Sequence, residues 1–215
     1  MNNLQRDAFL SGEGDAWFSR NYKDDSSSSL TCDLLAPLLQ GIPLANSSDI
    51  SVVELGCGQG LRLSALSKTR KWSLCGVDPS LASVSHCQNR GLRAFVGTAD
   101  KLEIESNSVD LLIYGFCLYL CDRSDLFSIA AEANRVLKSE SWIAILDFWS
   151  PNHHSNSYHH KPGLKSFKMD NSAMFTWHPN YMVVDHCVRH HNTHEYTDNS
   201  HYWISSTILR KSDFT

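Results

Sequence analysis

Three alternating glycines follow a short apolar stretch early in the chain. Residues 52–55 are apolar except for Glu54, and Gly56, Gly58 and Gly60 come directly after them. Glycine adopts positive φ and lets a backbone approach a ligand closely, and the free N–H groups of a following helix attract an anion. The pattern predicts a buried strand, a ligand-binding turn and then a helix. A glycine-rich turn that arose by chance between a core strand and a helix is the alternative.

The acid before the turn indicates which ligand it serves. A dinucleotide fingerprint is G-x-G-x-x-G/A, whereas the third glycine here, Gly60, comes one residue early. Glu54 can accept hydrogen bonds from a cationic, hydroxyl-bearing ligand but would repel a pyrophosphate. The turn resembles motif I, E/D-x-G-x-G-x-G, of the class I S-adenosylmethionine (SAM)-dependent methyltransferases. The resemblance implies S-adenosyl-L-methionine as cofactor and S-adenosyl-L-homocysteine as product.

A second carboxylate closes the next apolar stretch. Residues 72–78 predict a buried strand ending at Asp78, 18 residues beyond Gly60, which is the spacing of a β-α-β crossover. A carboxylate there can accept from both ribose hydroxyls, and the resemblance gives Asp78 this role. A cap for the helix predicted over 80–90 is the alternative.

The resemblance extends the cofactor site to further loops. After a predicted strand over 92–96, residues 97–102 resemble the family's adenine-binding loop, in which either Thr98 or Asp100 can accept from the adenine amino group. An N-terminal segment folds over the cofactor in many members; packing of its aromatics on the core is the alternative. The positions expected to bind the cofactor are Glu54, Gly56, Cys57, Gly58, Gly60, Asp78, Pro79, Thr98, Ala99, Asp100, Phe116, Trp17 and Asn21.

The elements that must position these residues indicate an α/β fold. Strands are expected over 109–114 and 142–148, with an amphipathic helix over 126–137 between them whose Phe127 faces the core. The family's usual Leu-Lys-Pro-Gly-Gly turn is here residues 137–141, and the missing glycines leave the turn type open. Two last strands, over 181–190 and 202–211, form an antiparallel hairpin. The resemblance implies a Rossmann-like, seven-stranded, mostly parallel sheet with an antiparallel last strand and helices on both faces.

The chain is expected to form a single domain over residues 1–215, since this length suits one ordinary core. Its parts are an N-terminal helical cap and linker over 1–48, a cofactor-binding core over 49–148, and an acceptor-side insertion with the last two strands over 149–215. Within the first part, residues 4–22 predict short helices joined by a glycine-containing loop, and 26–29 predict a polar linker.

The sequence becomes polar and aromatic beyond residue 148, and the resemblance implies that this segment shapes the acceptor pocket. An imidazole near neutrality can take a proton from an acceptor hydroxyl. The catalytic candidates are His153, His154 and Tyr119, and the acceptor-binding candidates are Tyr119, Tyr158 and Phe148. Lys161, Lys165 and Lys168 could contact a phosphate or carboxylate; ordinary exposed lysines are the alternative.

Composition restricts the partners. A net charge of −4 and a pI near 6.2 do not favour nucleic acid, and neither a signal peptide nor a membrane span is apparent, so a cytoplasmic location is expected. Seven cysteines without a C-x-x-C spacing are expected to be reduced and structural. Most of the eleven histidines lie after residue 150, several as adjacent pairs that point apart, so no metal site is expected. A monomer or homodimer is expected.

The sequence therefore predicts transfer of a methyl group to a small-molecule acceptor by in-line displacement. Residues 12–21 and 167–170 give a weaker resemblance to small type 11-like bacterial methyltransferases associated with sugars and polysaccharides, which implies a sugar or sugar nucleotide as acceptor. The alternatives are an inactive SAM-binding module that docks a partner, and an NAD-dependent oxidoreductase.

Overall fold

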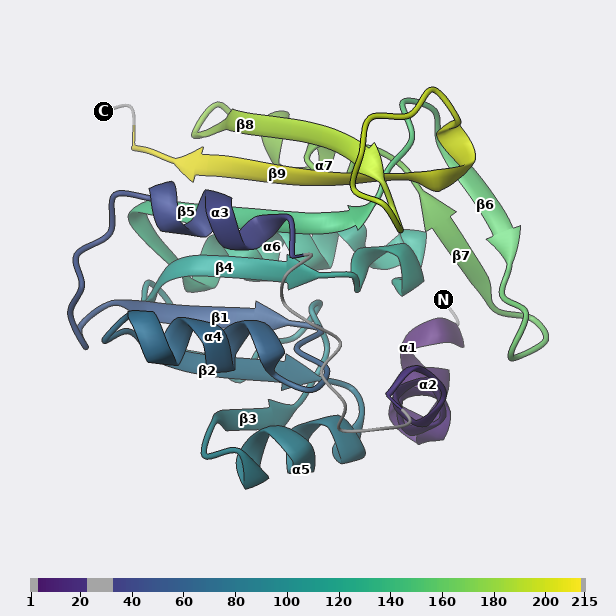
Figure 1. Cartoon of the computed structure of the whole chain (residues 1–215), viewed down its shortest axis with the longest axis horizontal. Coiled ribbons are helices and arrows are strands. Elements are labelled where there is room, and N and C mark those ends of the chain that lie inside the picture. The colour runs from purple at the N-terminus through teal and green to yellow at the C-terminus, as the bar shows by residue number, and fades with distance from the viewer. Residues whose placement is uncertain (1–3, 23–32, 214–215) are drawn as a thin grey trace.

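A seven-stranded sheet forms the centre of the computed structural model, which describes residues 4–22 and 33–213 (Figure 1). The strand order is β3-β2-β1-β4-β5-β9-β8. The first five strands are parallel, β9 runs antiparallel to β5, and β8 runs antiparallel to β9. The strands are β1 (Ser51–Leu55), β2 (Ser73–Asp78), β3 (Arg93–Val96), β4 (Val109–Gly115), β5 (Leu137–Phe148), β8 (Tyr181–His190) and β9 (Trp203–Lys211). The predicted fold class is confirmed.

Helices cover both faces of the sheet because side chains along the central strands alternate between two apolar clusters. Val52 of β1 packs on one face with α3 (Leu35–Gly41) and α4 (Leu61–Thr69). Its neighbour Val53 packs on the other face with α6 (Leu126–Val136) and α7 (Ala173–Thr176). Helix α5 (Leu81–Asn89) packs beside α4 over β2 and β3.

The inward face of α6 differs from the prediction. Ile129, Ala133 and Val136 are buried, whereas Phe127 is 81% exposed. The buried residues follow the i, i+4, i+7 spacing of one helix face. Phe127 precedes Ile129 by two positions, about 200° around the helix, so it points to solvent and the prediction for it was wrong.

Strand β5 begins at Leu137, five residues before the predicted start. The turn that lacks the family's glycines bends within this strand, where Glu140 has a φ of 58°. Few residues with a Cβ adopt this left-handed conformation. The Glu140 carboxylate accepts from the Arg210 guanidinium and from the Asp213 backbone N–H (3.2 Å), contacts that hold the turn without glycine.

Two N-terminal helices lie beyond the carboxyl ends of β1 and β2 (Figure 1). They are α1 (Leu4–Ala8) and α2 (Gly14–Asn21), joined by a π-helical turn, η1 (Phe9–Glu13), in which Gly12 has a φ of 126°. The predicted pair of short helices with a glycine-containing connection is therefore present. The predicted linker over 26–29 lies outside the described residues.

Beyond the sheet, a small hairpin of β6 (His154–Ser157) and β7 (Lys165–Lys168) stands at the same end of the molecule as these helices (Figure 1). The sequence did not predict it, because its short polar strands lack an apolar alternation. Within the described residues, short 3-10 helices lie at η3 (Leu118–Leu120), η4 (Arg123–Asp125) and η5 (Ser200–Tyr202). None of the helices in the described part of the chain is long and apolar enough to cross a membrane.

Polar contacts attach the N-terminal helices to the core. Asp15 Oδ1 accepts from the Ser80 hydroxyl (2.6 Å) and from the Ala82 backbone N–H (2.9 Å), so a residue of α2 caps the first turn of α5. Gly14 lies so close to the loop after β2 that a Cβ there would be 3.2 Å from the Ser80 nitrogen. The cap helices therefore rest directly on the segment that follows Asp78.

Asp15→Ala is expected to lower the free energy of unfolding by about 1 kcal/mol, since it removes a helix cap. Asp15→Asn is the matched control, because its amide oxygen keeps the acceptor. The Ser80 hydrogen bond, followed by that of Ala82, lowers the pKa of Asp15 below its usual 3.8. The stabilisation should therefore be present above pH 3.8 and be lost as the pH falls through the folded-state pKa. Urea unfolding at several pH values measures both effects, and equal stability of Asp15→Ala and wild type at pH 7 would contradict the capping role.

Candidate functional site

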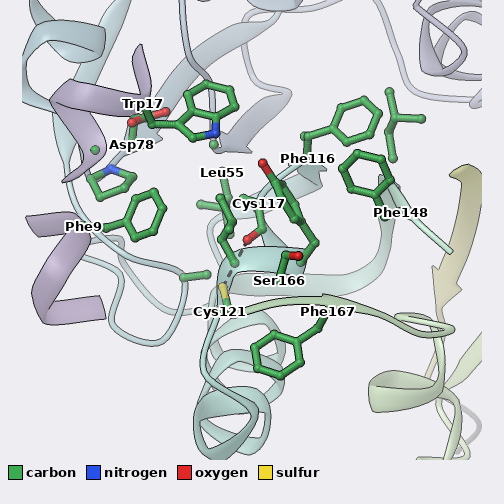
Figure 2. Close-up of a pocket in the computed structure, with 18 of the residues that line it drawn as sticks. Phe9, Trp17, Leu55, Asp78, Phe116, Cys117, Cys121, Phe148, Ser166 and Phe167 are labelled. Carbon is green, nitrogen blue, oxygen red and sulfur yellow. Dashed lines mark hydrogen bonds between the residues drawn. The ribbon is translucent and has the colours of Figure 1, made fainter. Parts of the chain in front are cut away.

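A cavity of about 990 Å³ lies at the carboxyl end of the parallel strands. The strand ends, the N-terminal helices, the β6-β7 hairpin and the segment after β8 all contribute lining residues. Ligands of open α/β sheets bind at this edge. Figure 2 shows Trp17 and Asp78 on one side of the pocket and Phe116 and Phe148 on the other.

The glycine turn after β1 has the backbone that its sequence predicts. Gly56, Gly58 and Gly60 all have positive φ, at 72°, 51° and 69°. A Cβ at Gly56 would lie 2.7 Å from Cys117 Cβ, so the turn also needs glycine to pack against the segment after β4. Gly60 then precedes the first turn of α4. Gly56 lines the cavity, whereas Gly58 and Gly60 shape the turn behind it.

Buried charges form the wall beside this turn. Glu54 accepts from Arg62 Nη1, and Arg62 also donates from Nε (2.6 Å) and Nη2 (3.0 Å) to the two carboxylate oxygens of Asp33. Burial raises the pKa of Glu54 to about 7 even though Arg62 lies against it. Glu54 Oε2 is buried and has no hydrogen-bond partner among residues 4–22 and 33–213. A buried acceptor without a donor is costly, so this oxygen is suited to a ligand N–H or O–H group.

Asp78 lies at the end of β2 and faces the same part of the cavity. Its Oδ2 accepts from the Gly58 backbone N–H (3.0 Å) and its Oδ1 from the Ser80 backbone N–H (2.9 Å). Burial raises its pKa. Each carboxylate oxygen has a second lone pair, so the pair of oxygens is positioned by the backbone and still able to accept from two adjacent hydroxyls.

The loop after β3 meets the first N-terminal helix. Thr98, Ala99 and Asp100 line the cavity. Asp100 Oδ2 accepts from Arg6 Nη1 (2.5 Å), which ties this loop to α1. The Asp100 carboxylate therefore serves to hold the cap, and the uncharged Thr98 is the other candidate acceptor in this loop.

Aromatic rings form the opposite side of the cavity. Phe148 packs edge-on against Phe116, with centroids 5.5 Å apart, and against Tyr119, with centroids 5.0 Å apart. Phe116 has a φ of 50°, which is uncommon for an aromatic residue and typical of strained functional loops. Asp147 fixes the backbone of this loop, since its Oδ2 accepts from the backbone N–H of Leu118 (2.8 Å) and of Tyr119 (3.3 Å).

Two tyrosines that the sequence predicted to bind the acceptor line the cavity. Burial raises the pKa of Tyr119, with a further contribution from Asp147. Tyr158 donates from its hydroxyl to Glu13 (3.0 Å) and accepts from Arg20 (2.9 Å). The cap, the aromatic side and the hairpin therefore meet around one cavity.

The histidine prediction fits the structure least well. His153 and His154 do not line the main cavity but a smaller hollow of about 350 Å³ beside it, which shares Asn156, Lys168 and His201 with the main cavity. Other histidines line the main cavity: His159, His160, His191, His194 and His201. Among the described residues no three His, Cys, Asp or Glu side chains are placed to hold a metal ion.

The structure brings most of the predicted positions together. Those that line the main cavity are Trp17, Asn21, Glu54, Gly56, Cys57, Asp78, Pro79, Thr98, Ala99, Asp100, Phe116, Tyr119, Phe148 and Tyr158. Sequence reasoning missed Arg62, Asp33 and Asp147. For Arg62 a signal existed, because an acid buried in a central strand requires a cation nearby. Asp147 gave no such signal, because the backbone N–H groups that donate to it belong to the loop after β4, and the sequence does not specify the conformation of that loop.

Comparison with protein families identifies the central part of the chain. Residues 52–140 match the family model described as methyltransferase domain. No curated protein sequence matches the chain.

Solved structures share the fold at low sequence identity. The geranyl diphosphate C-methyltransferase from Streptomyces coelicolor A3(2), solved with Mg²⁺, geranyl diphosphate and S-adenosyl-L-homocysteine, has a TM-score of 0.70 at 11% identity, over 99% of this chain and 100% of its own. The 1,6-didemethyltoxoflavin-N1-methyltransferase from Burkholderia thailandensis, solved with 1,6-didemethyltoxoflavin and S-adenosylhomocysteine, has a TM-score of 0.68 at 15% identity, over 97% and 87%. The [4+2]-cyclase SpnF has a TM-score of 0.57 at 14% identity, over 77% and 76%. These identities show a shared fold, and the fold hosts more than one reaction.

Arg62→Met is expected to destabilise the protein by about 3–5 kcal/mol, since it leaves two buried carboxylates without their cation. Lys68→Met is the matched control, because it removes an exposed cation from the same helix, α4. Urea unfolding at pH 7 measures the difference. A loss below about 1 kcal/mol for Arg62→Met would contradict the buried network.

Proposed function

The chain carries a class I SAM-dependent methyltransferase domain, and we propose that it transfers the methyl group of SAM to a small-molecule acceptor, a sugar or sugar nucleotide. The observation that carries the proposal is the division of the cavity. Three buried acids and one arginine form the wall beside the glycine turn, and the rings of Phe116, Tyr119 and Phe148 form the other side.

The acidic side suits SAM better than a dinucleotide. Arg62 pairs with Asp33 and Glu54, and Asp78 adds a third carboxylate to the cavity lining, so this wall favours a cationic ligand over a pyrophosphate. Glu54 Oε2 would accept from the cofactor's ammonium group, and Asp78 from its ribose hydroxyls. Thr98 and Ala99 would border the adenine. The bound sulfonium supplies an activated methyl carbon.

The remaining task of the protein is alignment and exclusion of water. The N-terminal helices cover the cofactor side through Asp15 and Arg6, and the aromatic rings give the acceptor an apolar surface to stack on. Tyr119 is protonated at neutral pH, and burial raises its pKa further, so it would donate a hydrogen bond to the acceptor and would not act as a base. A base at His153 or His154 would require the acceptor to extend into the side hollow.

The size of the cavity favours a small acceptor. Pockets for small ligands are typically about 300–1,000 Å³, and the main cavity of about 990 Å³ can hold a cofactor together with a compact second molecule. The two methyltransferases of similar fold were solved with small molecules bound. An inactive SAM-binding module would bind the cofactor without turnover, and an NAD-dependent enzyme would bind a dinucleotide at the same edge.

Asp78→Ala is expected to weaken S-adenosylhomocysteine binding about 100-fold, since two hydrogen bonds to a carboxylate are lost. Calorimetry measures the affinity, and a cooperative unfolding transition of the ligand-free variant shows that it is folded. Asp49→Ala, an exposed acid before β1, is the control. Unchanged affinity would contradict the role of Asp78, and binding of NAD in place of S-adenosylhomocysteine would favour the oxidoreductase.

Phe148→Ala is expected to lower methyl transfer about 100-fold while S-adenosylhomocysteine affinity stays within about twofold, because Phe148 lies on the acceptor side. Phe127→Ala removes the same side chain from an exposed position and should leave transfer unchanged. A labelled-methyl screen against sugars and sugar nucleotides supplies the acceptor. Tight cofactor binding without turnover on any acceptor would support the inactive module.

A further inference from the structure

Four basic side chains from three separate segments line one end of the main cavity. Lys168 ends β7, His191 and His194 follow β8, and His201 belongs to η5. We refer to these four residues as the basic wall. The acids of the cavity come from other elements, chiefly from β1, β2 and the loop after β3.

Two residues of the basic wall contact the ring of Phe148. Lys168 Nζ lies 5.2 Å from the centre of the Phe148 ring, and the His191 ring centre lies 5.3 Å from it. Lys168 also donates to the backbone oxygen of His201, which fixes the ammonium group between β7 and η5. An ammonium group has three donors, so this contact leaves Lys168 with donors for a ligand.

The basic wall lacks an opposite charge. Among residues 4–22 and 33–213, no carboxylate forms an ion pair with any of its four members. Burial lowers the pKa of Lys168, and burial followed by His190, Lys168 and His194 lowers that of His191. The groups that lower the pKa of His191 besides burial are all basic side chains. An anion in the cavity would favour the protonated form of His191.

We propose that the basic wall binds an oxyanion of the acceptor, a phosphate or a carboxylate. This inference rests on the proposed function, because it gives the acceptor its charge. It also selects one lysine from the three that the sequence offered: Lys168 lines the cavity, whereas Lys161 and Lys165 do not. The anionic group would lie at the basic wall, the body of the acceptor would stack on Phe148, and the reacting atom would point to the acidic side.

The test is a calorimetric titration of the protein saturated with S-adenosylhomocysteine. Inorganic pyrophosphate and succinate are the probes, at constant ionic strength set with sodium chloride. We expect pyrophosphate or succinate to bind wild type, and Lys168→Gln to weaken that binding about tenfold, since a charge-assisted hydrogen bond is lost. Lys161→Gln removes the same charge from the same hairpin outside the cavity and should bind as wild type does. The tighter probe identifies the oxyanion as phosphate or carboxylate.

Equal affinities for wild type and Lys168→Gln, or binding of neither probe by wild type, would overturn the proposal. His194→Asn is the second variant if Lys168→Gln does not fold, because asparagine tolerates the φ of 58° at this position, and it should weaken binding by a smaller factor. If S-adenosylhomocysteine does not bind, the proposed function is contradicted, but the proposal for the basic wall is not. The same titration of the unliganded protein then still tests the basic wall.

Discussion

The ion pairs of Arg62 are the constraint on which the cavity depends. Glu54 is placed in a central strand, where only 3% of its surface is exposed, and Asp33 comes from a different segment of the chain. One guanidinium binds both acids, which is possible because its donors form a planar fork. A Cβ at Gly115 would lie 2.8 Å from Arg62 Nη1, so the neighbouring strand β4 must end in glycine to leave room for the pair. The glycine turn, the acid and the strand end are therefore parts of one arrangement.

The cap over the cavity is attached by polar groups in addition to an apolar cluster around Phe9 and Leu164. Gln5 donates to the Leu120 backbone oxygen (2.5 Å) and accepts from the Lys165 backbone N–H (2.7 Å), so one buried amide joins α1, η3 and the β6-β7 hairpin. Asp15 and Arg6 add the contacts to α5 and to the loop after β3. Polar contacts of this kind fix direction more than they add stability. Such an attachment suits a cover that must lie over a ligand in one defined position.

Local patterns in the sequence account for the sheet and for the acidic side of the cavity. Period-two strands, glycines that require positive φ and acids at strand ends each depend on a few neighbouring residues, and all were predicted close to their observed positions. The aromatic side of the cavity depends on residues that are distant in sequence. His191 approaches Phe148 only because β8 and β9 add to the far edge of the sheet, and Lys168 does so only through a hairpin of polar strands. The predicted inward direction of Phe127 was wrong because apolar residues of α6 occupy more than one face of the helix, and only the face with Ile129 is buried.

Opposite charges at the two ends of the cavity give the site a direction. The fold alone does not specify a reaction, as the similarity to a [4+2]-cyclase shows. The acidic end of the cavity favours a cationic cofactor, and the basic end favours an anionic second molecule. Each ligand would be repelled at the other's position by the charges there. The two ligands would also attract each other across the aromatic rings. Binding of either would then favour binding of the other, since each partly neutralises the field that the next one meets.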